Sequence, residues 1–264
     1  MISFCGIGKH GRLGNQMFQF AAALGVAKRI GVEAAFPREN LIPTAPKEIF
    51  QLPRCFKINT NLLKNRREIK VDSVFKEKFL HFDPNVFDVS PNTELIGFFQ
   101  SEKYFDHAVN DIRENFIFDE RTHRLASDFL ARANRKTVAV HVRRGDFVNN
   151  TAHGDLTRYY PQALLHFDQK EFLFVIISDD IRWCRRHFND GRAYIFSAAK
   201  NPYIDLCIMS LCNHNIIANS SYSWWGAWLN PRPNKIVIAP KAWFGPRLSH
   251  CDPKDIYCTD WIVI

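Results

Sequence analysis

The sequence predicts an α/β fold, and two observations support this prediction. The chain opens with an apolar segment, residues 2–7, followed by a glycine-rich turn and a helical pattern, which is how a β-α-β unit begins. Its second half alternates short apolar runs with helical segments, which is typical of a parallel sheet covered on both faces. With 264 residues, the chain has room for one large or two small domains.

In the first half, the opening helix is indicated by Met17, Phe20 and Leu24, which recur at helical spacing, and Gly31 stands where its C-terminal cap should lie. Residues 37–92 are predicted to be irregular because prolines interrupt them repeatedly. A strand is expected at 94–99. Two helices should follow it, one around 105–112 and the other around 125–133.

The second half is more regular. Strands are predicted at 137–142, 171–177, 192–196, 214–218 and 235–239, and helices near 158–168, 180–188, 202–212 and 222–229. We place a domain boundary near residues 134–136, which gives an N-terminal domain of residues 1–135 and a C-terminal domain of residues 136–264. The last four residues, 261–264, form a tail that we expect to pack back on the N-terminal domain.

Composition narrows the class of protein. The net charge of +8 fits a nucleic-acid binder, a protein near anionic lipid, or a site for a multiply negative ligand. The basic clusters are short and lack a helix-turn-helix or zinc-finger context, so no nucleic-acid partner is expected. No apolar run approaches the ~20 residues of a membrane helix, and no signal peptide is visible. We therefore expect a cytoplasmic protein, at most in peripheral contact with a membrane surface. The seven cysteines contain no Cys-x-x-Cys pair and are expected to be reduced thiols.

Polar side chains follow four predicted strands of the second half. In an open α/β sheet, ligands bind at the carboxyl ends of the strands, so these residues are candidates for a site. They are His141, Arg143, Arg144 and Asp146 after the first strand, Asp179 and Asp180 after the second, Ser197 after the third, and Ser221, Tyr222 and Ser223 after the fourth.

Each group has a functional and a structural interpretation. The adjacent arginines can hold a diphosphate, because a guanidinium keeps its charge and bonds phosphate through two parallel N–H groups, or they form a surface pair with Asp146. The helix that begins at Ser221 can accept an anion or carry an ordinary cap. Asp179 or Asp180 can accept from a base or ribose, or cap the next helix. Because the chain has no Asp-x-Asp triplet, we expect no metal and assign the charge of a leaving diphosphate to arginine and a helix N-terminus.

The glycine-rich loop near the N-terminus contains Arg12, Gly14 and Asn15. It matches neither the GxxxxGK[ST] nor the GxGxxG pattern, which disfavours a P-loop kinase. Asn15 either faces a ligand or serves as part of an ordinary helix start.

Four sequence blocks occur together along the chain: GRLGNQMFQFAAALG at 11–25, HVRRGDF at 141–147, ISDDIRWC at 177–184 and DLCIMSLCNHNIIANSSYSWWGAWLN at 205–230. With these blocks, in this order, the chain resembles the α-1,2-fucosyltransferases of glycosyltransferase family 11. The resemblance implies a GT-B fold, in which two Rossmann-like domains with parallel sheets face each other across a cleft. GDP-fucose would bind the C-terminal domain, and the N-terminal domain would lie on the acceptor side.

The resemblance also implies the reaction. Fucose would pass with inversion from GDP-β-L-fucose to the 2-hydroxyl of a terminal β-galactoside on an oligosaccharide or glycolipid, with neither metal nor other cofactor. By position, Arg143 matches the arginine on the β-phosphate, and Asp146 and Asn15 are the other catalytic candidates. The donor would contact His141, Arg144, Ser197, one of Asp179 and Asp180, and a phosphate cradle formed by Ser221, Tyr222 and Ser223. Arg12 and Gly14 match a loop that related enzymes bring near the reacting centre.

Two questions stay open at this stage. The base that removes the acceptor proton is either Asp146 or His10, and Asp146 could instead orient Arg143. The competing function is a non-catalytic carbohydrate- or GDP-binding protein on a transferase scaffold, in which Trp224, Trp225 and Trp228 would stack on sugar or, at helical spacing, form core.

Overall fold

The computed structural model describes residues 1–43 and 48–264, and its contacts divide the chain into two compact units. The N-terminal unit comprises Met1–Asp119 and Cys251–Ile256, and the C-terminal unit comprises Glu120–His250 and Tyr257–Ile264. This division lies earlier than the boundary predicted near residues 134–136. The reason is that helix α3 (Glu120–Leu130) packs against helix α6 (Pro202–Leu211) and so belongs to the C-terminal unit.

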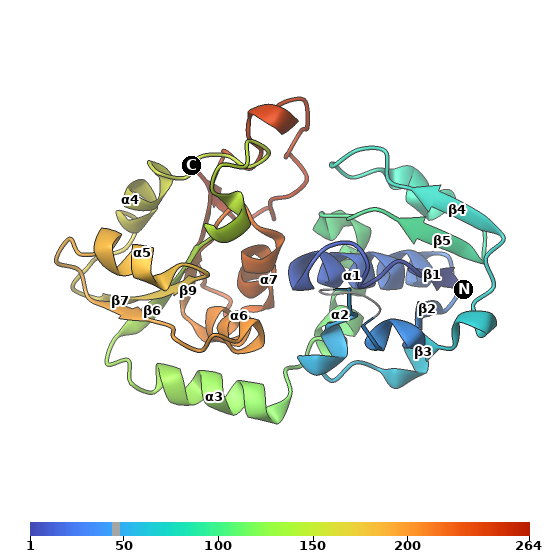
Figure 1. The fold of residues 1–264 in the computed structure, drawn as a ribbon, viewed down its shortest axis with the longest axis horizontal. Helices are drawn as coiled ribbons and strands as arrows, with labels where there is room; N and C mark the ends of the chain where they lie inside the picture. Colours follow the sequence, from blue (N-terminus) through green and yellow to red (C-terminus); the bar gives the residue numbers. More distant parts are fainter. Residues whose placement is uncertain (44–47) are drawn as a thin grey trace. The chain divides into compact units, whose positions relative to one another are not determined.

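The N-terminal unit contains a five-stranded parallel sheet with strand order β3-β2-β1-β5-β4 (Figure 1). Its strands are β1 (Ile2–Ser3), β2 (Ala34–Pro37), β3 (Leu63–Lys64), β4 (Ser73–Lys76) and β5 (Thr93–Ile96), and its helices are α1 (Leu13–Arg29) and α2 (Val109–Asn115). Residues 37–92 are therefore less irregular than predicted, since they supply β3 and β4; residues 44–47 of this region lie outside the described residues.

Local backbone geometry sets the ends of the first elements. The predicted first strand is shortened to two residues because the chain turns immediately after it, and the N–H of Ile7 donates to the carbonyl of Phe4 at 3.2 Å. Helix α1 ends as predicted beside Gly31, whose φ of 73° is a conformation that glycine adopts without steric cost.

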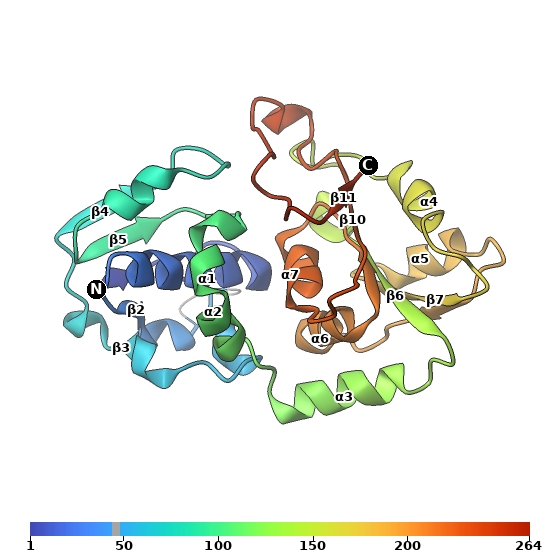
Figure 2. The same ribbon diagram turned by 180° about the vertical axis from the view of Figure 1, so that it is seen from behind.

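The C-terminal unit contains a six-stranded parallel sheet with strand order β11-β10-β9-β6-β7-β8. Its strands are β6 (Lys136–Val142), β7 (Phe172–Ser178), β8 (Tyr194–Phe196), β9 (His214–Ile216), β10 (Val237–Ala239) and β11 (Ile262–Val263). All five predicted strands of the second half are present. The tail does not pack back on the N-terminal unit; β11 instead pairs with β10 and completes the C-terminal sheet (Figure 2).

Helices cover both faces of this sheet, as the alternating pattern predicts. Helices α4 (Tyr159–Leu164) and α5 (Ile181–His187) lie on one side, while α6 and α7 (Ser221–Leu229) pack together on the other (Figure 1). Trp224 and Trp225 of α7 are completely buried and Trp228 is 6% exposed. Their role in the described structure is to form core, and the sugar-stacking alternative has no exposed ring here to support it.

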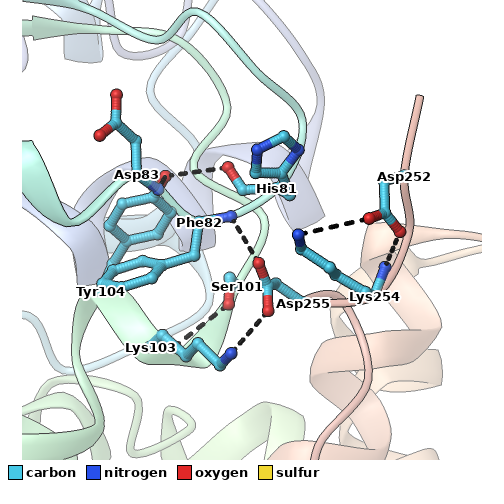
Figure 3. Close-up of polar contacts among 9 residues, drawn as sticks. All are labelled: His81, Phe82, Asp83, Ser101, Lys103, Tyr104, Asp252, Lys254 and Asp255. Atoms are coloured by element: carbon cyan, nitrogen blue, oxygen red, sulfur yellow. Dashed lines mark hydrogen bonds and ion pairs between the residues drawn. The ribbon is translucent and has the colours of Figure 1, made fainter. Parts of the chain in front are cut away.

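A late segment of the chain completes the N-terminal unit. Figure 3 shows the carboxylate of Asp255 accepting the backbone N–H of Phe82 at 3.0 Å and the Lys103 ammonium at 2.6 Å. Burial acts to raise the pKa of Asp255, but the bonds from Lys103 and Phe82 outweigh it, so the pKa lies below its usual range. The segment Cys251–Ile256, rather than the terminal tail, is thus the part of the C-terminal sequence that belongs with the N-terminal unit.

Candidate functional site

Two adjacent arginines follow strand β6, and carboxylates hold both of them. Arg143 Nη1 lies 2.8 Å from Asp179 Oδ2, and Arg143 Nη2 pairs with Asp146. Arg144 Nε donates to Asp180 Oδ2 at 3.3 Å. These contacts join the ends of β6 and β7, which are neighbours in the sheet. The predicted pair between Arg143 and Asp146 is present, and it is one part of a larger charged cluster.

Asp179 and Asp180 each serve more than one partner. Asp179 Oδ1 accepts the backbone N–H of Arg144 at 2.9 Å, while its other oxygen pairs with Arg143. Asp180 caps α5, because its Oδ1 accepts the N–H of Trp183 at 3.0 Å. That bond is the main reason why the pKa of Asp180 is lowered, and the bond from Arg144 adds to it. Both oxygens of Asp180 are therefore engaged within the protein.

The turn that follows the arginines approaches the carboxylate of Asp179 closely. A Cβ placed on Gly145 would lie 2.4 Å from Asp179 Oδ2, closer than non-bonded atoms can approach. Glycine at this position lets the β6 loop approach the carboxylate that pairs with Arg143.

His141 lies on β6 and is 3% exposed. Burial, with a smaller contribution from the charge of Arg143, lowers its pKa to about 3, so the ring is neutral near pH 7. Its Nδ1 is buried and has no hydrogen-bond partner among the described residues, and the ring lies 5.3 Å from that of Tyr222 between centroids. An unsatisfied buried polar atom costs about 1–3 kcal/mol, so a ligand that bonds to this nitrogen would remove that cost.

The remaining predicted polar residues of the C-terminal unit differ in burial and in their hydrogen bonds. Ser221 and Tyr222 are half-buried at the start of α7, and the Tyr222 hydroxyl donates to the carbonyl of Pro202 at 2.6 Å. Ser223 is fully buried, and its hydroxyl donates to main-chain carbonyls of its own turn. The Ser197 hydroxyl donates to Asp205, whose pKa burial raises to about 6.

A cavity of about 600 Å³ opens beside the arginines. Its walls come from the β6 loop, α4 and α5, and they include Arg143, Arg144 and the aromatic side chains of Phe147, Tyr160 and Trp183. A volume of this size is within the range of small-molecule pockets. The candidate site therefore combines fixed positive charge with an apolar wall.

Sequence reasoning missed the roles of Phe147 and Trp183. The centre of the Arg143 guanidinium lies 5.3 Å from the Phe147 ring centroid, and that of Arg144 lies 4.0 Å from the Trp183 ring centroid. Both rings stand within the motifs HVRRGDF and ISDDIRWC, but the spacing alone does not show which face of each ring meets an arginine.

In the N-terminal unit, the predicted residues lie at the start of α1, beyond the carboxyl end of β1. Arg12 is the exposed N-cap residue, Gly14 is buried, and Asn15 is half-buried. Asn15 Oδ1 accepts the Gln100 amide at 2.8 Å, which links α1 to the segment after β5. The structure therefore groups these three residues together, in a different unit from the arginine cluster.

The segment before Gln100 has an unusual backbone. Phe99 has a φ of 54°, which is rare for an aromatic residue, and Gly97 has a φ of 155°. The Glu77 carboxylate accepts the N–H groups of Phe98 at 2.6 Å and Phe99 at 2.8 Å. Burial raises the pKa of Glu77 despite these two bonds. We call residues 97–100 the β5 turn; it sets the direction in which Gln100 meets Asn15.

Two features are absent from the described residues. In the part of the chain that the structure covers, no three His, Cys, Asp or Glu side chains are grouped so that they could hold a metal ion. Among the same residues, no helix has both the length and the apolar character needed to cross a bilayer.

Comparison with solved structures defines the class of fold. The chain is similar to POFUT1 in complex with GDP, at a TM-score of 0.53 and 18% identity over 89% of this chain and 97% of that one. It is also similar to the fucosyltransferase NodZ from Bradyrhizobium, at a TM-score of 0.57 and 12% identity over 87% and 93%. At such identities the likeness shows the fold: two Rossmann-like parallel sheets of the GT-B class of glycosyltransferases.

Sequence comparison then gives the family. The family model described as Glycosyl transferase family 11 matches residues 3–264, and the chain belongs to this family. It is 30% identical to the O-antigen biosynthesis glycosyltransferase WbnK of Escherichia coli, over 89% of this chain and 93% of that protein. It is 38% identical to an alpha-1,2-colitosyltransferase of Escherichia coli (58% and 57%), and 30% identical to the galactoside 2-alpha-L-fucosyltransferase SEC1 of Bos taurus (84% and 63%). The resemblance carried by the four sequence blocks is confirmed.

Proposed function

We propose that this chain transfers L-fucose from GDP-β-L-fucose to the 2-hydroxyl of a terminal β-galactoside, with inversion and without a metal. The observation that carries the proposal is the match to Glycosyl transferase family 11 over residues 3–264, together with relatives named for α-1,2 transfer of fucose or colitose.

The charged cluster supports a diphosphate donor. Arg143 and Arg144 follow a central strand of a parallel sheet, at the edge where ligands of such sheets bind. In our scheme the donor diphosphate bonds to both guanidinium groups, and His141 Nδ1 gains its missing partner from the same ligand. Main-chain N–H groups at the start of α7 add to the phosphate cradle, whereas the inward hydroxyl of Ser223 does not.

The bond changes balance without a cofactor. The acceptor hydroxyl oxygen forms a bond to the anomeric carbon while the bond from that carbon to the β-phosphate oxygen breaks, and GDP leaves with the electron pair. Arg143 stabilises the charge that develops on the leaving phosphate. Asp146 is paired with Arg143, which favours its orienting role over its role as the base. The proton passes to a base or to water at the acceptor hydroxyl.

The N-terminal unit is the acceptor side in this proposal. Asn15 and Gln100 present amide groups at the carboxyl end of their sheet. Amides donate and accept hydrogen bonds, as a neutral sugar hydroxyl requires, and Arg12 is an exposed cation next to them.

The experiment is a transfer assay. The purified protein is incubated with GDP-fucose and a panel of β-galactosides, each also in chelator, and any product is analysed for linkage. We expect an α-1,2-linked fucosyl product whose yield the chelator leaves unchanged. A strict requirement for Mn²⁺ or Mg²⁺ would contradict the metal-free scheme, and heat on GDP binding without any product would favour the non-catalytic alternative.

The same assay should include a second candidate donor, GDP-colitose, because the chain is 38% identical to an α-1,2-colitosyltransferase over part of its length. GDP-colitose is offered to the protein in parallel with GDP-fucose. A higher kcat/KM with GDP-colitose would move the proposal from fucosyl to colitosyl transfer while keeping the site.

A further inference from the structure

Each arginine of the candidate site lies over an aromatic ring, and each ring is stacked on a histidine. We call the group Arg144, Trp183 and His187 the tryptophan stack. The corresponding group formed by residues 143, 147 and 153 is the phenylalanine stack. We propose that Trp183 and Phe147 are positioning residues, which fix the planes of the two guanidinium groups for a diphosphate donor. This inference rests on the proposed function.

The tryptophan stack is built on one helix. The Trp183 and His187 rings lie 3.7 Å apart between centroids and within 15° of parallel, and the Arg144 guanidinium lies 4.0 Å from the Trp183 centroid. Two groups this close to one ring centre cannot share a face, so arginine and histidine cover opposite faces. The His187 ring is held in turn by a 2.8 Å bond between its Nδ1 and the carbonyl of Trp183. Trp183 therefore has little freedom to rotate.

The phenylalanine stack is built on a loop. The Phe147 and His153 rings lie 3.4 Å apart and are nearly parallel, and the Arg143 guanidinium lies 5.3 Å from the Phe147 centroid. His153 is held by an isolated antiparallel bridge to Phe244. The loop that carries Phe147 and His153 is therefore paired, through this bridge, with another segment of the C-terminal unit.

Rings and carboxylates restrict different motions of the arginines. The carboxylates fix the direction of the N–H groups: Asp180 receives Nε of Arg144, while Asp146 and Asp179 receive the terminal nitrogens of Arg143. An aromatic face instead fixes the plane of a guanidinium, because the cation is attracted to the face of the ring within about 6 Å of its centroid. With plane and direction both set, the remaining N–H groups keep one orientation, which lowers the entropy lost when a diphosphate binds.

The two rings also belong to the wall of the cavity. Phe147, Trp183 and both arginines line the same space of about 600 Å³. The rings are therefore part of the surface that a ligand meets, and they are more than packing beneath it.

The proposal predicts different kinetic effects for the two rings. In the proposed reaction both guanidinium groups bond to the diphosphate, but the bond from Arg143 strengthens as charge develops on the leaving phosphate, so the larger effect of Arg143 falls on kcat and that of Arg144 on donor binding. Trp183→Leu should raise the Kd for GDP about tenfold and change kcat less than about threefold. Phe147→Leu should lower kcat about tenfold and change the Kd for GDP less than about threefold. The ring-preserving variants Trp183→Phe and Phe147→Tyr should restore most of each loss.

The measurements are GDP calorimetry, steady-state kinetics with GDP-fucose, and thermal denaturation of every variant. Phe87→Leu is the matched control, because the Arg29 guanidinium lies 5.7 Å from that ring in the N-terminal unit and His107 packs on it edge-on. The control should keep the wild-type Kd and kcat. An NMR spectrum adds a direct readout: in Trp183→Leu, the Nε–H resonance of Arg144 should lose the ring-current shift that the tryptophan imposes.

The outcomes separate the two levels of the proposal. A wild-type protein that neither binds GDP nor uses GDP-fucose overturns the proposed function, whatever the variants do. A wild-type protein that binds GDP, with leucine variants that behave like it, overturns the positioning role alone. That role is also overturned if Trp183→Phe fails to restore binding, or if Trp183→Leu and Phe147→Leu each lose kcat and affinity together.

Discussion

The carboxyl edges of the two parallel sheets differ although the sheets share one construction. At the edge of the C-terminal sheet, arginines and aspartates form a charged cluster beside a cavity of about 600 Å³. At the edge of the N-terminal sheet, the corresponding loops present the amide pair of Asn15 and Gln100 and a turn with positive φ angles. The side chains that follow the strands, and not the strands themselves, decide what each edge can bind.

This difference supports the proposed assignment of the donor to the C-terminal unit and of the acceptor to the N-terminal unit. A fixed cluster of guanidinium groups suits a diphosphate, because charge-assisted bonds are about twice as strong as neutral ones. An edge of amides suits a neutral glycan, which needs donors and acceptors in equal measure. The predictions below either separate these two roles or show that the edges are not specialised.

The largest effect is expected from Arg143→Ala, which removes the guanidinium between Asp146 and Asp179. Loss of one group that stabilises transition-state charge typically costs about 10²–10³-fold in kcat, so transfer should become barely detectable. Arg143→Lys keeps the charge without the bidentate geometry, so its kcat should lie between those of wild type and Arg143→Ala. Steady-state kinetics measure both, and the exposed Arg124→Ala is the control. Near-wild-type turnover in Arg143→Ala would remove the catalytic role from the charged edge.

A smaller effect, on the KM for the acceptor alone, is expected from Gln100→Leu. This change breaks the 2.8 Å bond to Asn15 Oδ1, and a hydrogen bond of this kind contributes about 0.5–1.5 kcal/mol. The KM for the galactoside should rise roughly two- to tenfold while the KM for GDP-fucose stays unchanged. The exposed Gln169→Leu serves as the control. A rise in the donor KM instead would show that the edge carrying Asn15 and Gln100 is not specialised for the acceptor.

The β5 turn offers a test of stability rather than catalysis. In Gly97→Ala, the new Cβ would lie 2.4 Å from Glu77 Cβ at a φ of 155°, so the turn must distort. Strain of this kind costs about 1–3 kcal/mol, which should lower the melting temperature of the protein. Gly6→Ala is the matched control, because its new Cβ would meet nothing closer than His10 Cδ2 at 4.0 Å. Equal melting temperatures for the two variants would mean that the turn is not strained.

The last prediction concerns the pH dependence of stability. Burial raises the pKa of Asp205 to about 6, above the 3.8 of a free aspartate, so the folded protein keeps this proton more readily than the unfolded chain. The contribution of Asp205 to stability is therefore greatest below about pH 4 and falls as the pH rises towards 6, by about 3 kcal/mol. Asp205→Asn keeps an acceptor for the Ser197 hydroxyl and should remove this dependence.

Denaturant unfolding of wild type and Asp205→Asn at pH 4, 6 and 8 measures the effect. The exposed Asp128→Asn is the control and should keep the wild-type profile. If wild type and Asp205→Asn change in parallel across this range, Asp205 does not carry the proposed proton.

Much of the fold was predictable because its signals are local. Alternating apolar runs and helical spacing were enough to place all five predicted strands of the C-terminal sheet, from β6 to β10. The strands of the proline-rich region were missed because β3 contains only two residues and β4 has no buried side chain that would give an apolar run. The last strand was misassigned for a similar reason: a two-residue strand, β11, is recognisable only by its partner β10.

The candidate site was also predicted only in part. The sequence identified Arg143, Arg144, Asp179 and Asp180 because residues after parallel strands meet at one edge. It did not identify Trp183 or Phe147 as their partners, since a ring that packs on an arginine looks like any aromatic residue in a chain with 23 phenylalanines.

By itself, the sequence determined the α/β class, the order of the regular elements in the second half and the residue types at the strand ends, because these depend on local periodicity and on position along the chain. Only the tertiary structure decided the long-range pairings: Arg143 with Asp179, Arg144 over a tryptophan, and Asp255 with the N-terminal unit. Such pairings join residues that lie far apart along the chain, and they depend on distances and ring orientations that no local pattern encodes.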